Sequence, residues 1–90
     1  MRRIRFVVVG RVQGVAFRAY AQAEARRLGV MGFVQNRPDG AVEGEAEGRP
    51  DDVVAFLAWL RTGSPWSRVD NVEIDEMSVV GNDGTFDVHR

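Results

Sequence analysis

The sequence predicts an α+β sandwich in which two helices cover one face of an antiparallel sheet, with the element order βαββαβ. Three observations support this prediction: apolar runs with the two-residue period of strands, two stretches with the period of amphipathic helices, and glycine- or proline-bearing turns between them. Of its 90 residues, 44% are hydrophobic and 28% charged, as in an ordinary globular protein. We expect residues 1–90 to form a single domain, because no linker, repeat or low-complexity segment divides them.

The first strand and the first helix are expected on either side of a glycine-bearing loop. Residues 3–9 form a short run rich in β-branched side chains, which favours a strand buried on both faces. Residues 18–28 place apolar side chains on one helical stripe and charged ones on the opposite side. Gly29 follows, and it can end the helix in the left-handed conformation.

Two further strands are expected at residues 30–36 and 41–47, joined by a turn at residues 37–40 in which proline precedes glycine by two positions. The second of these strands alternates small or apolar residues with glutamates. We therefore expect an inner face that packs closely against a helix and a solvated outer face whose glutamates pair with arginines of the first strand. These charged residues are Glu43, Glu45, Glu47, Arg3 and Arg5.

The second helix is expected to begin at Pro50, ahead of two aspartates, and to end at Gly63. An alternating apolar pattern at residues 69–74 predicts the next strand, and the phase slips near Met77, which indicates a bulge or a strand break there. A turn at residues 81–84 precedes a last short strand. This order, with the final strand divided in two, is that of the ferredoxin-like sandwich, a fold that does not by itself specify a function.

Charge and composition exclude several classes of function. With 12 basic and 13 acidic residues, the formal net charge is −1, which does not favour nucleic-acid or membrane partners. Cysteine is absent, which excludes disulfides, thiolate nucleophiles and cysteine-ligated zinc. The one histidine, His89, is expected to be a solvated strand residue, and we expect no metal or other cofactor. The aromatic residues Tyr20, Trp59 and Trp66 are expected to pack in the core or at its rim.

The sequence also predicts a cytoplasmic location. No apolar stretch approaches the roughly 20 residues that span a bilayer. The apolar run at residues 6–9 follows three arginines but is much shorter than the apolar region of a secretory signal. We expect a monomer.

The loop at residues 10–18, Gly-Arg-Val-Gln-Gly-Val-Ala-Phe-Arg, is the most informative segment. It leaves a strand and opens a helix, an arrangement in which free backbone N–H groups and the positive helix end can hold an anion. Residues 1–23 contain five arginines and no acidic residue, so this region is locally positive. Arg18 is placed where its planar guanidinium could bind phosphate with two hydrogen bonds. Neither a P-loop nor a dinucleotide-binding pattern is present.

Residues 10–18 resemble the acylphosphatase signature G-x-V-Q-G-V-x-F-R at every specified position. Residues 32–48 resemble the second signature of the same family, through the run Gly-Phe-Val-Gln-Asn at 32–36 followed by Gly40, Val42 and Gly48. The length and the element order agree along the whole chain. The C-terminal residues 86–90 depart from the arginine and aromatic residue with which the family often ends, and this leaves the contact of the tail with the site open.

The resemblance implies an enzyme that hydrolyses the carboxyl–phosphate bond of small acyl phosphates without a metal. It implies that Arg18 binds the substrate phosphate and that Asn36 orients the attacking water. The backbone N–H groups that would hold the phosphate with Arg18 belong to Val12, Gln13, Gly14, Val15, Ala16, Phe17 and Arg18 itself.

This chemistry is consistent with the residue types present. An acyl phosphate expels a carboxylate whose conjugate acid has a pKa of about 4–5, so no general acid is needed. Phosphoryl transfer then depends on positioning and on the stabilisation of negative charge. Ordinary phosphate monoesters, which expel a poor alkoxide, are expected to react very slowly.

Two alternatives remain. The first is a non-catalytic module that binds an anion such as carbamoyl phosphate on the same loop. The second is an RNA-binding domain, because RNA-recognition motifs share the βαββαβ order. The glutamates at 43, 45 and 47 disfavour the second alternative, because they would repel a phosphate backbone from the open sheet face.

Overall fold

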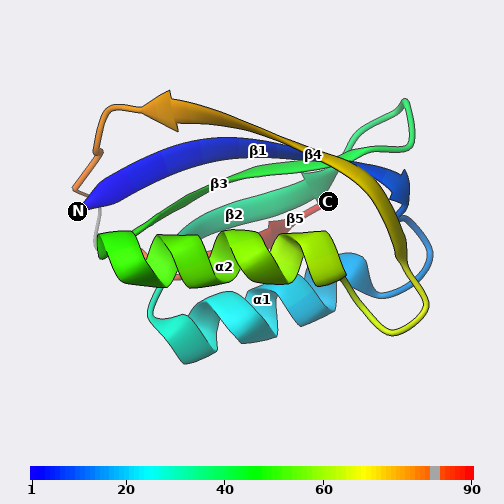
Figure 1. Cartoon of the computed structure of the whole chain (residues 1–90), viewed down its shortest axis with the longest axis horizontal. Helices are drawn as coiled ribbons and strands as arrows, with labels where there is room; N and C mark the ends of the chain where they lie inside the picture. The colour runs from blue at the N-terminus through cyan, green and yellow to red at the C-terminus, as the bar shows by residue number, and fades with distance from the viewer. Residues whose placement is uncertain (82–83) are drawn as a thin grey trace.

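The computed structural model describes residues 1–81 and 84–90. In this part of the chain it has five strands and two helices in the order β1-α1-β2-β3-α2-β4-β5 (Figure 1). The bounds are β1 Arg2–Arg11, α1 Phe17–Leu28, β2 Met31–Asn36, β3 Val42–Gly48, α2 Pro50–Thr62, β4 Arg68–Met77 and β5 Phe86–His89. The predicted elements are confirmed, with ends that move by a few residues. The centre of the predicted turn at residues 81–84 lies outside the described residues.

The sheet has the strand order β4-β1-β3-β2-β5, and both helices cover the same face (Figure 1). The ferredoxin-like sandwich is therefore confirmed. The expectation of a wholly antiparallel sheet is wrong at one edge, because β5 pairs with β2 in parallel. The reason is the path of the chain, which reverses after β4. Because β4 runs opposite to β2, the reversed strand β5 runs in the same direction as β2.

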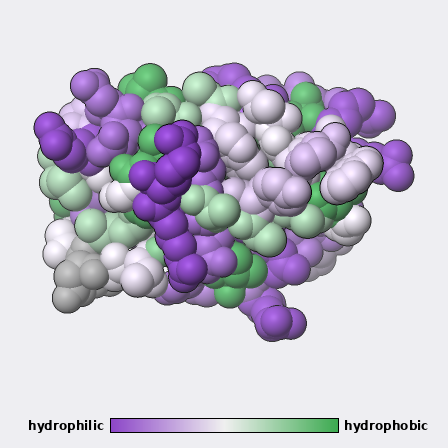
Figure 2. Space-filling model, turned by 90° about the horizontal axis from the view of Figure 1, so that it is seen from below, coloured by the Kyte–Doolittle hydropathy of each residue, from purple (hydrophilic) through white to green (hydrophobic). Residues whose placement is uncertain are grey.

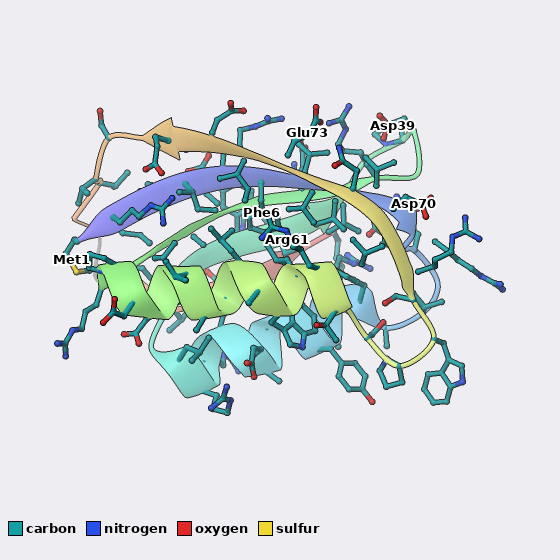
Figure 3. All side chains as sticks on the ribbon, viewed as in Figure 1. Met1, Phe6, Asp39, Arg61, Asp70 and Glu73 are labelled. Carbon is teal, nitrogen blue, oxygen red and sulfur yellow. The ribbon has the colours of Figure 1, made fainter. Side chains whose placement is uncertain are left out.

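The core lies between the sheet and the helices and is built around aromatic rings. Phe6 of β1 meets Phe56 of α2 edge-on, with ring centroids 5.9 Å apart, and Phe56 meets Phe86 of β5 at 5.4 Å. Each such pair contributes about 0.5–1.5 kcal/mol beyond the burial of its surface. Figure 3 shows Phe6 directed from the sheet toward the helices and Glu73 directed away from them. The rings thus connect one helix to both the centre and the edge of the sheet.

The helical side of the molecule is polar on its outer surface. Figure 2, which views this side, shows hydrophobic residues scattered among hydrophilic ones rather than gathered in one patch. Trp59 packs on Phe56 and Phe17, as expected for a core or rim residue. Trp66 does not, since it is 73% exposed in the loop after α2. No helix in residues 1–81 and 84–90 is both long and apolar enough to cross a membrane.

β4 has the strand break predicted near Met77, and it also has a bulge that the sequence analysis did not predict. The strand ends at Met77, which is a strand break, but the bulge occurs opposite Val9 and Gly10, where Asp70 is inserted into the ladder. In the sequence, the bulge corresponds to the spacing of Val69 and Val72. Their side chains both pack against the core although they are three residues apart, and a regular strand returns to the same face every two residues. At this point β1 and β4 approach so closely that a Cβ at Gly10 would lie 2.1 Å from a carbonyl oxygen, so only glycine fits.

The outer face of the sheet carries the expected pairs of arginines and glutamates, but part of it is buried. Arg3 donates to Glu45 and to Glu47, and Arg5 donates to Glu43. Glu47 was expected to be solvated, and it is instead fully buried. Its carboxylate accepts hydrogen bonds from the backbone N–H groups of residues 80 and 81, at 2.8 and 3.1 Å, because the segment after β4 folds over it.

Glu47 gives a prediction about acid stability. Burial acts to raise the pKa of Glu47, but the N–H donors of residues 80 and 81 and the guanidinium of Arg3 outweigh it and hold that pKa below its ordinary value. Folding therefore gains from the ionised carboxylate above the unfolded-state pKa, about 4.3, and loses this gain as pH falls through the lower folded-state value. We expect Glu47→Gln to lower the free energy of unfolding at pH 7 by about 2 kcal/mol.

The measurement is urea unfolding at pH 7 and at pH 3 to 4. Because glutamine does not titrate, the Glu47→Gln variant should lose less additional stability on acidification than the unaltered chain. The control is Glu76→Gln, which removes an exposed partner of Arg2 and should leave the stability at pH 7 nearly unchanged. Equal acid sensitivity of the Glu47→Gln variant and the unaltered chain would contradict the prediction.

Candidate functional site

Three segments that are distant in the sequence meet at one end of the molecule. They are the loop between β1 and α1, the end of β2 before its turn, and the end of β5 (Figure 1). Between them lies a pocket of about 250 Å³. It is lined by six of the residues predicted for the site, namely Val12, Gly14, Ala16, Phe17, Arg18 and Asn36, together with Ala19, Gln22 and Val88. Gln13 and Val15 belong to the same loop but do not line the pocket.

The backbone of the loop alternates in conformation in a way that exposes its N–H groups. Gly14 has φ 75° and Ala16 has φ 58°, both in the left-handed region. Ala16 is the only non-glycine residue with positive φ among residues 1–81 and 84–90. This conformation costs a residue with a side chain about 1–2 kcal/mol. Such alternation turns successive N–H groups toward one side, which creates a concave site for an anion.

The N–H groups of this loop have no hydrogen-bond partner in the part of the chain that the structure describes. None of the backbone N–H groups of residues 13–18 donates a hydrogen bond to another residue in the described part of the chain. Helix α1 begins at Phe17, one residue earlier than predicted, and has no side-chain cap and no acidic residue in its first turn. The positive end of this helix is therefore not neutralised locally, and it faces the pocket.

Arg18 lies in the first turn of α1 and lines the pocket. Its Nη1 donates a hydrogen bond of 2.8 Å to the main-chain carbonyl of His89. The contact of the C-terminal tail with the site, which the sequence left open, is thus made by the carbonyl of His89 and by Val88, which lines the pocket. His89 itself stacks on Phe33 on the outer face of the sheet, with ring centroids 4.7 Å apart.

Asn36 is the last residue of β2, and its position follows from the alternation of that strand. Val34, two residues earlier, is fully buried under the helices, so Asn36 lies on the same face of the sheet. Because the strand ends there, Asn36 is exposed at the pocket rather than buried in the core. The turn that follows is held by a bond from the N–H of Arg37 to the carbonyl of Ala41.

Side chains that the sequence analysis did not place in the site hold these segments together. Gln13 donates through Nε2 to the carbonyls of Arg37 and Ala41, at 2.8 and 2.9 Å, and so connects the loop to the β2–β3 turn. Gln22 donates to the carbonyl of Phe86 and connects α1 to β5. Ser64, after α2, donates to the carbonyl of Val15. Their acceptors are backbone carbonyls distant in the sequence, so no residue pattern could reveal them.

No group of three or more histidine, cysteine, aspartate or glutamate side chains that could hold a metal ion occurs within residues 1–81 and 84–90. The side chains that do line the pocket are a guanidinium, two carboxamides and apolar groups. These groups can bind an anion and orient a neutral polar molecule.

Comparison with known proteins assigns the chain to a family. A sequence model of the acylphosphatase family matches residues 4–88. The chain belongs to the acylphosphatase family. It is 51% identical over 86 residues to an acylphosphatase of Anaeromyxobacter dehalogenans, a match that covers 96% of this chain and 92% of that protein.

Solved structures agree with this assignment. The crystal structure of acylphosphatase from Bacillus subtilis superposes on all of this chain with a TM-score of 0.96 and 37% sequence identity. The structure of HypF from T. kodakarensis also contains a similar region, with a TM-score of 0.86 and 32% identity, but this chain covers only 12% of that larger protein. The chain is accordingly an enzyme of the acylphosphatase type, whose name implies acyl phosphates as substrates.

The bonds from Gln13 yield a prediction for this acylphosphatase. They fix the separation of the loop that carries Arg18 from the turn that follows Asn36. Because small misplacements of reacting groups are costly, we expect Gln13→Ala to lower the turnover of an acyl phosphate by about tenfold. It should also lower the free energy of unfolding by about 1–3 kcal/mol, since two hydrogen bonds between the loop and the turn are lost.

A matched control is Gln35→Ala. Gln35 donates a similar part-buried bond, to Glu43, on the outer face of the same strand pair. This variant should lose stability and keep its turnover under steady-state assay with acetyl phosphate. If Gln13→Ala and Gln35→Ala have the same turnover, the positioning role of Gln13 is wrong.

Proposed function

We propose that this chain hydrolyses acyl phosphates by holding the phosphate group in the loop between β1 and α1. The phosphate is bound by the guanidinium of Arg18 and by the backbone N–H groups of residues 12–18. The single observation that carries this proposal is that the N–H groups of residues 13–18 have no partner within the described part of the chain, in a loop from which Gly14, Ala16 and Phe17 line one pocket with Arg18. Gly14 and Ala16 are exposed, so an anion can reach these donors from solvent, and their place at a helix N-terminus beside an arginine supports the binding of an anion there.

Asn36 is proposed to orient the water that attacks phosphorus. Its carboxamide has both a donor and an acceptor, so it can hold a water molecule in a fixed direction, but it cannot take a proton as a base. Support comes from its place on the wall of the pocket that Arg18 also lines. We propose that the proton of the water passes to the phosphate of the substrate or to solvent.

The arrangement requires no general acid and no metal in this proposal. The leaving carboxylate departs without a proton, because its conjugate acid has a pKa of about 4–5. Charge that develops on the phosphoryl oxygens is stabilised by fixed donors that need no rearrangement during the reaction. Removal of one such donor typically costs about 10²–10³ in rate.

The sequence analysis left open a non-catalytic module that binds an anion such as carbamoyl phosphate. Membership of the acylphosphatase family, with coverage of 92% of the length of an acylphosphatase that is 51% identical, supports the enzyme instead. Release of inorganic phosphate from acetyl phosphate separates the two, because only the enzyme produces it.

The roles of Arg18 and Asn36 predict different kinetic defects. Arg18→Gln should lower turnover by about 10²-fold or more and should also weaken competitive inhibition by inorganic phosphate, because both depend on phosphate binding. Asn36→Ala should lower turnover by a similar factor and leave phosphate inhibition nearly unchanged, because it acts on water.

Both variants are compared with the unaltered chain in the hydrolysis of benzoyl phosphate, with and without a chelator. Addition of the chelator should change nothing. If the Asn36→Ala variant retains full turnover, water is oriented by another group. If the Arg18→Gln variant is inhibited by phosphate as strongly as the unaltered chain, the proposed phosphate site is wrong.

The absence of a titrating base from this mechanism predicts a flat pH profile. We expect kcat to vary little between about pH 5 and 7.5, as long as the protonation of the substrate does not change. The measurement is steady-state hydrolysis across this range with correction for the substrate pKa. A steep bell-shaped profile that follows an enzyme side chain would contradict the mechanism.

A further inference from the structure

A second loop supports the β1–α1 loop from outside the pocket. It comprises residues 63–67, between α2 and β4, and lies at the same end of the molecule (Figure 1). Ser64 in this loop is only 3% exposed, and its Oγ donates a hydrogen bond of 2.8 Å to the carbonyl oxygen of Val15. Ser64 does not line the pocket, so it has no direct access to a bound anion.

The bond to Val15 fixes the direction of the next N–H group. The peptide between Val15 and Ala16 is trans, and in a planar trans peptide the C=O and the N–H point in opposite directions. Because the carbonyl of Val15 points to Ser64, the N–H of Ala16 points away from Ser64. Ala16 lines the pocket and Val15 does not, which is the arrangement expected if that N–H is directed toward the pocket.

This peptide has a reason to rotate if the bond is removed. Ala16 has φ 58°, a left-handed conformation that is unfavourable for alanine. Rotation of the peptide plane between Val15 and Ala16 can bring φ of Ala16 back to negative values, and it reverses both the C=O and the N–H. Ser64 opposes this rotation, because it would separate the carbonyl of Val15 from the hydroxyl.

Ser64 is itself held in place. Its carbonyl accepts hydrogen bonds from both the N–H and the Oγ of Ser67, at 3.0 and 2.7 Å. The preceding residue, Gly63, donates to the carbonyl of Trp59 at the end of α2, and Trp59 packs on Phe17 at the start of α1. The hydroxyl of Ser64 is therefore presented from a loop fixed to the core.

We propose that Ser64 is a positioning residue of this acylphosphatase, which keeps the N–H of Ala16 directed at the phosphate group of the substrate. The inference rests on the proposed function of the loop as a phosphate site. Ser64 acts through the Val15–Ala16 peptide and touches neither the substrate nor the reacting atoms. Its effect is therefore expected on phosphate binding and on kcat/KM together.

The test compares Ser64→Ala with Ser67→Ala, a matched control that removes a hydroxyl bond of the same loop without touching Val15. Inorganic phosphate is the probe, and binding is followed by titration calorimetry and by the amide resonance of Ala16. We expect Ser64→Ala to bind phosphate about tenfold more weakly, as for the loss of one hydrogen bond to a charged group. Its kcat/KM should fall at least as much. Ser67→Ala should bind phosphate like the unaltered chain, because the backbone N–H of Ser67 still donates to the carbonyl of Ser64.

The amide resonance separates positioning from general destabilisation. In the unaltered chain the Ala16 N–H should shift strongly downfield as phosphate binds, and in Ser64→Ala this shift should be largely lost. If the Ala16 resonance of the unaltered chain does not respond to bound phosphate, the inference is wrong, whatever the stability of the variants. The same holds if Ser64→Ala binds phosphate as tightly as the unaltered chain.

Failure of the proposed function gives a different result. In that case the unaltered chain would show no phosphate binding in the loop, or Arg18→Gln would bind phosphate equally well. If Arg18→Gln loses phosphate binding while Ser64→Ala keeps it, the phosphate site stands and only the role of Ser64 is rejected.

Discussion

The structure at the functional end of this molecule depends on one constraint: the backbone N–H groups of residues 13–18 find no acceptor within the described chain. Backbone donors without an acceptor in the protein need water or a ligand as their partner. Here they are grouped at the start of α1, where the positive end of the helix adds to their field. We propose that these donors hold an anion, to which Arg18 on the wall of the pocket adds a full positive charge.

The rest of the fold keeps this loop from collapsing into a conformation that pairs its own donors. The bulge at Asp70 and the close contact at Gly10 set the end of β1. Phe17, 1% exposed and packed on Trp59, fixes the start of α1. Between these two points the loop is held on one side by Gln13 and on the other by Ser64. A strained residue, Ala16, persists because its surroundings determine its conformation.

The features that depend on local chemistry could be predicted from the sequence. Periodicity indicated the helices and strands, and the two signatures singled out Arg18 and Asn36, which line one pocket. The features that could not be predicted depend on contacts between distant segments. Glu47 looks like Glu43 and Glu45 in β3, which are only partly buried, and the chain after β4 buries it fully. The parallel pairing of β5 and the hydroxyl bond of Ser64 likewise depend on where remote elements meet.

The most direct test of the central claim is a crystal structure of the chain with inorganic phosphate. The account predicts a phosphate in the β1–α1 loop, with its oxygens within hydrogen-bond distance of the backbone nitrogens of residues 13–18 and of the Arg18 guanidinium. The Asn36 carboxamide should lie on the wall of the same pocket and hold a water molecule on the open side of the phosphorus. A phosphate bound elsewhere, or an Asn36 carboxamide turned away from any water near it, would contradict the account.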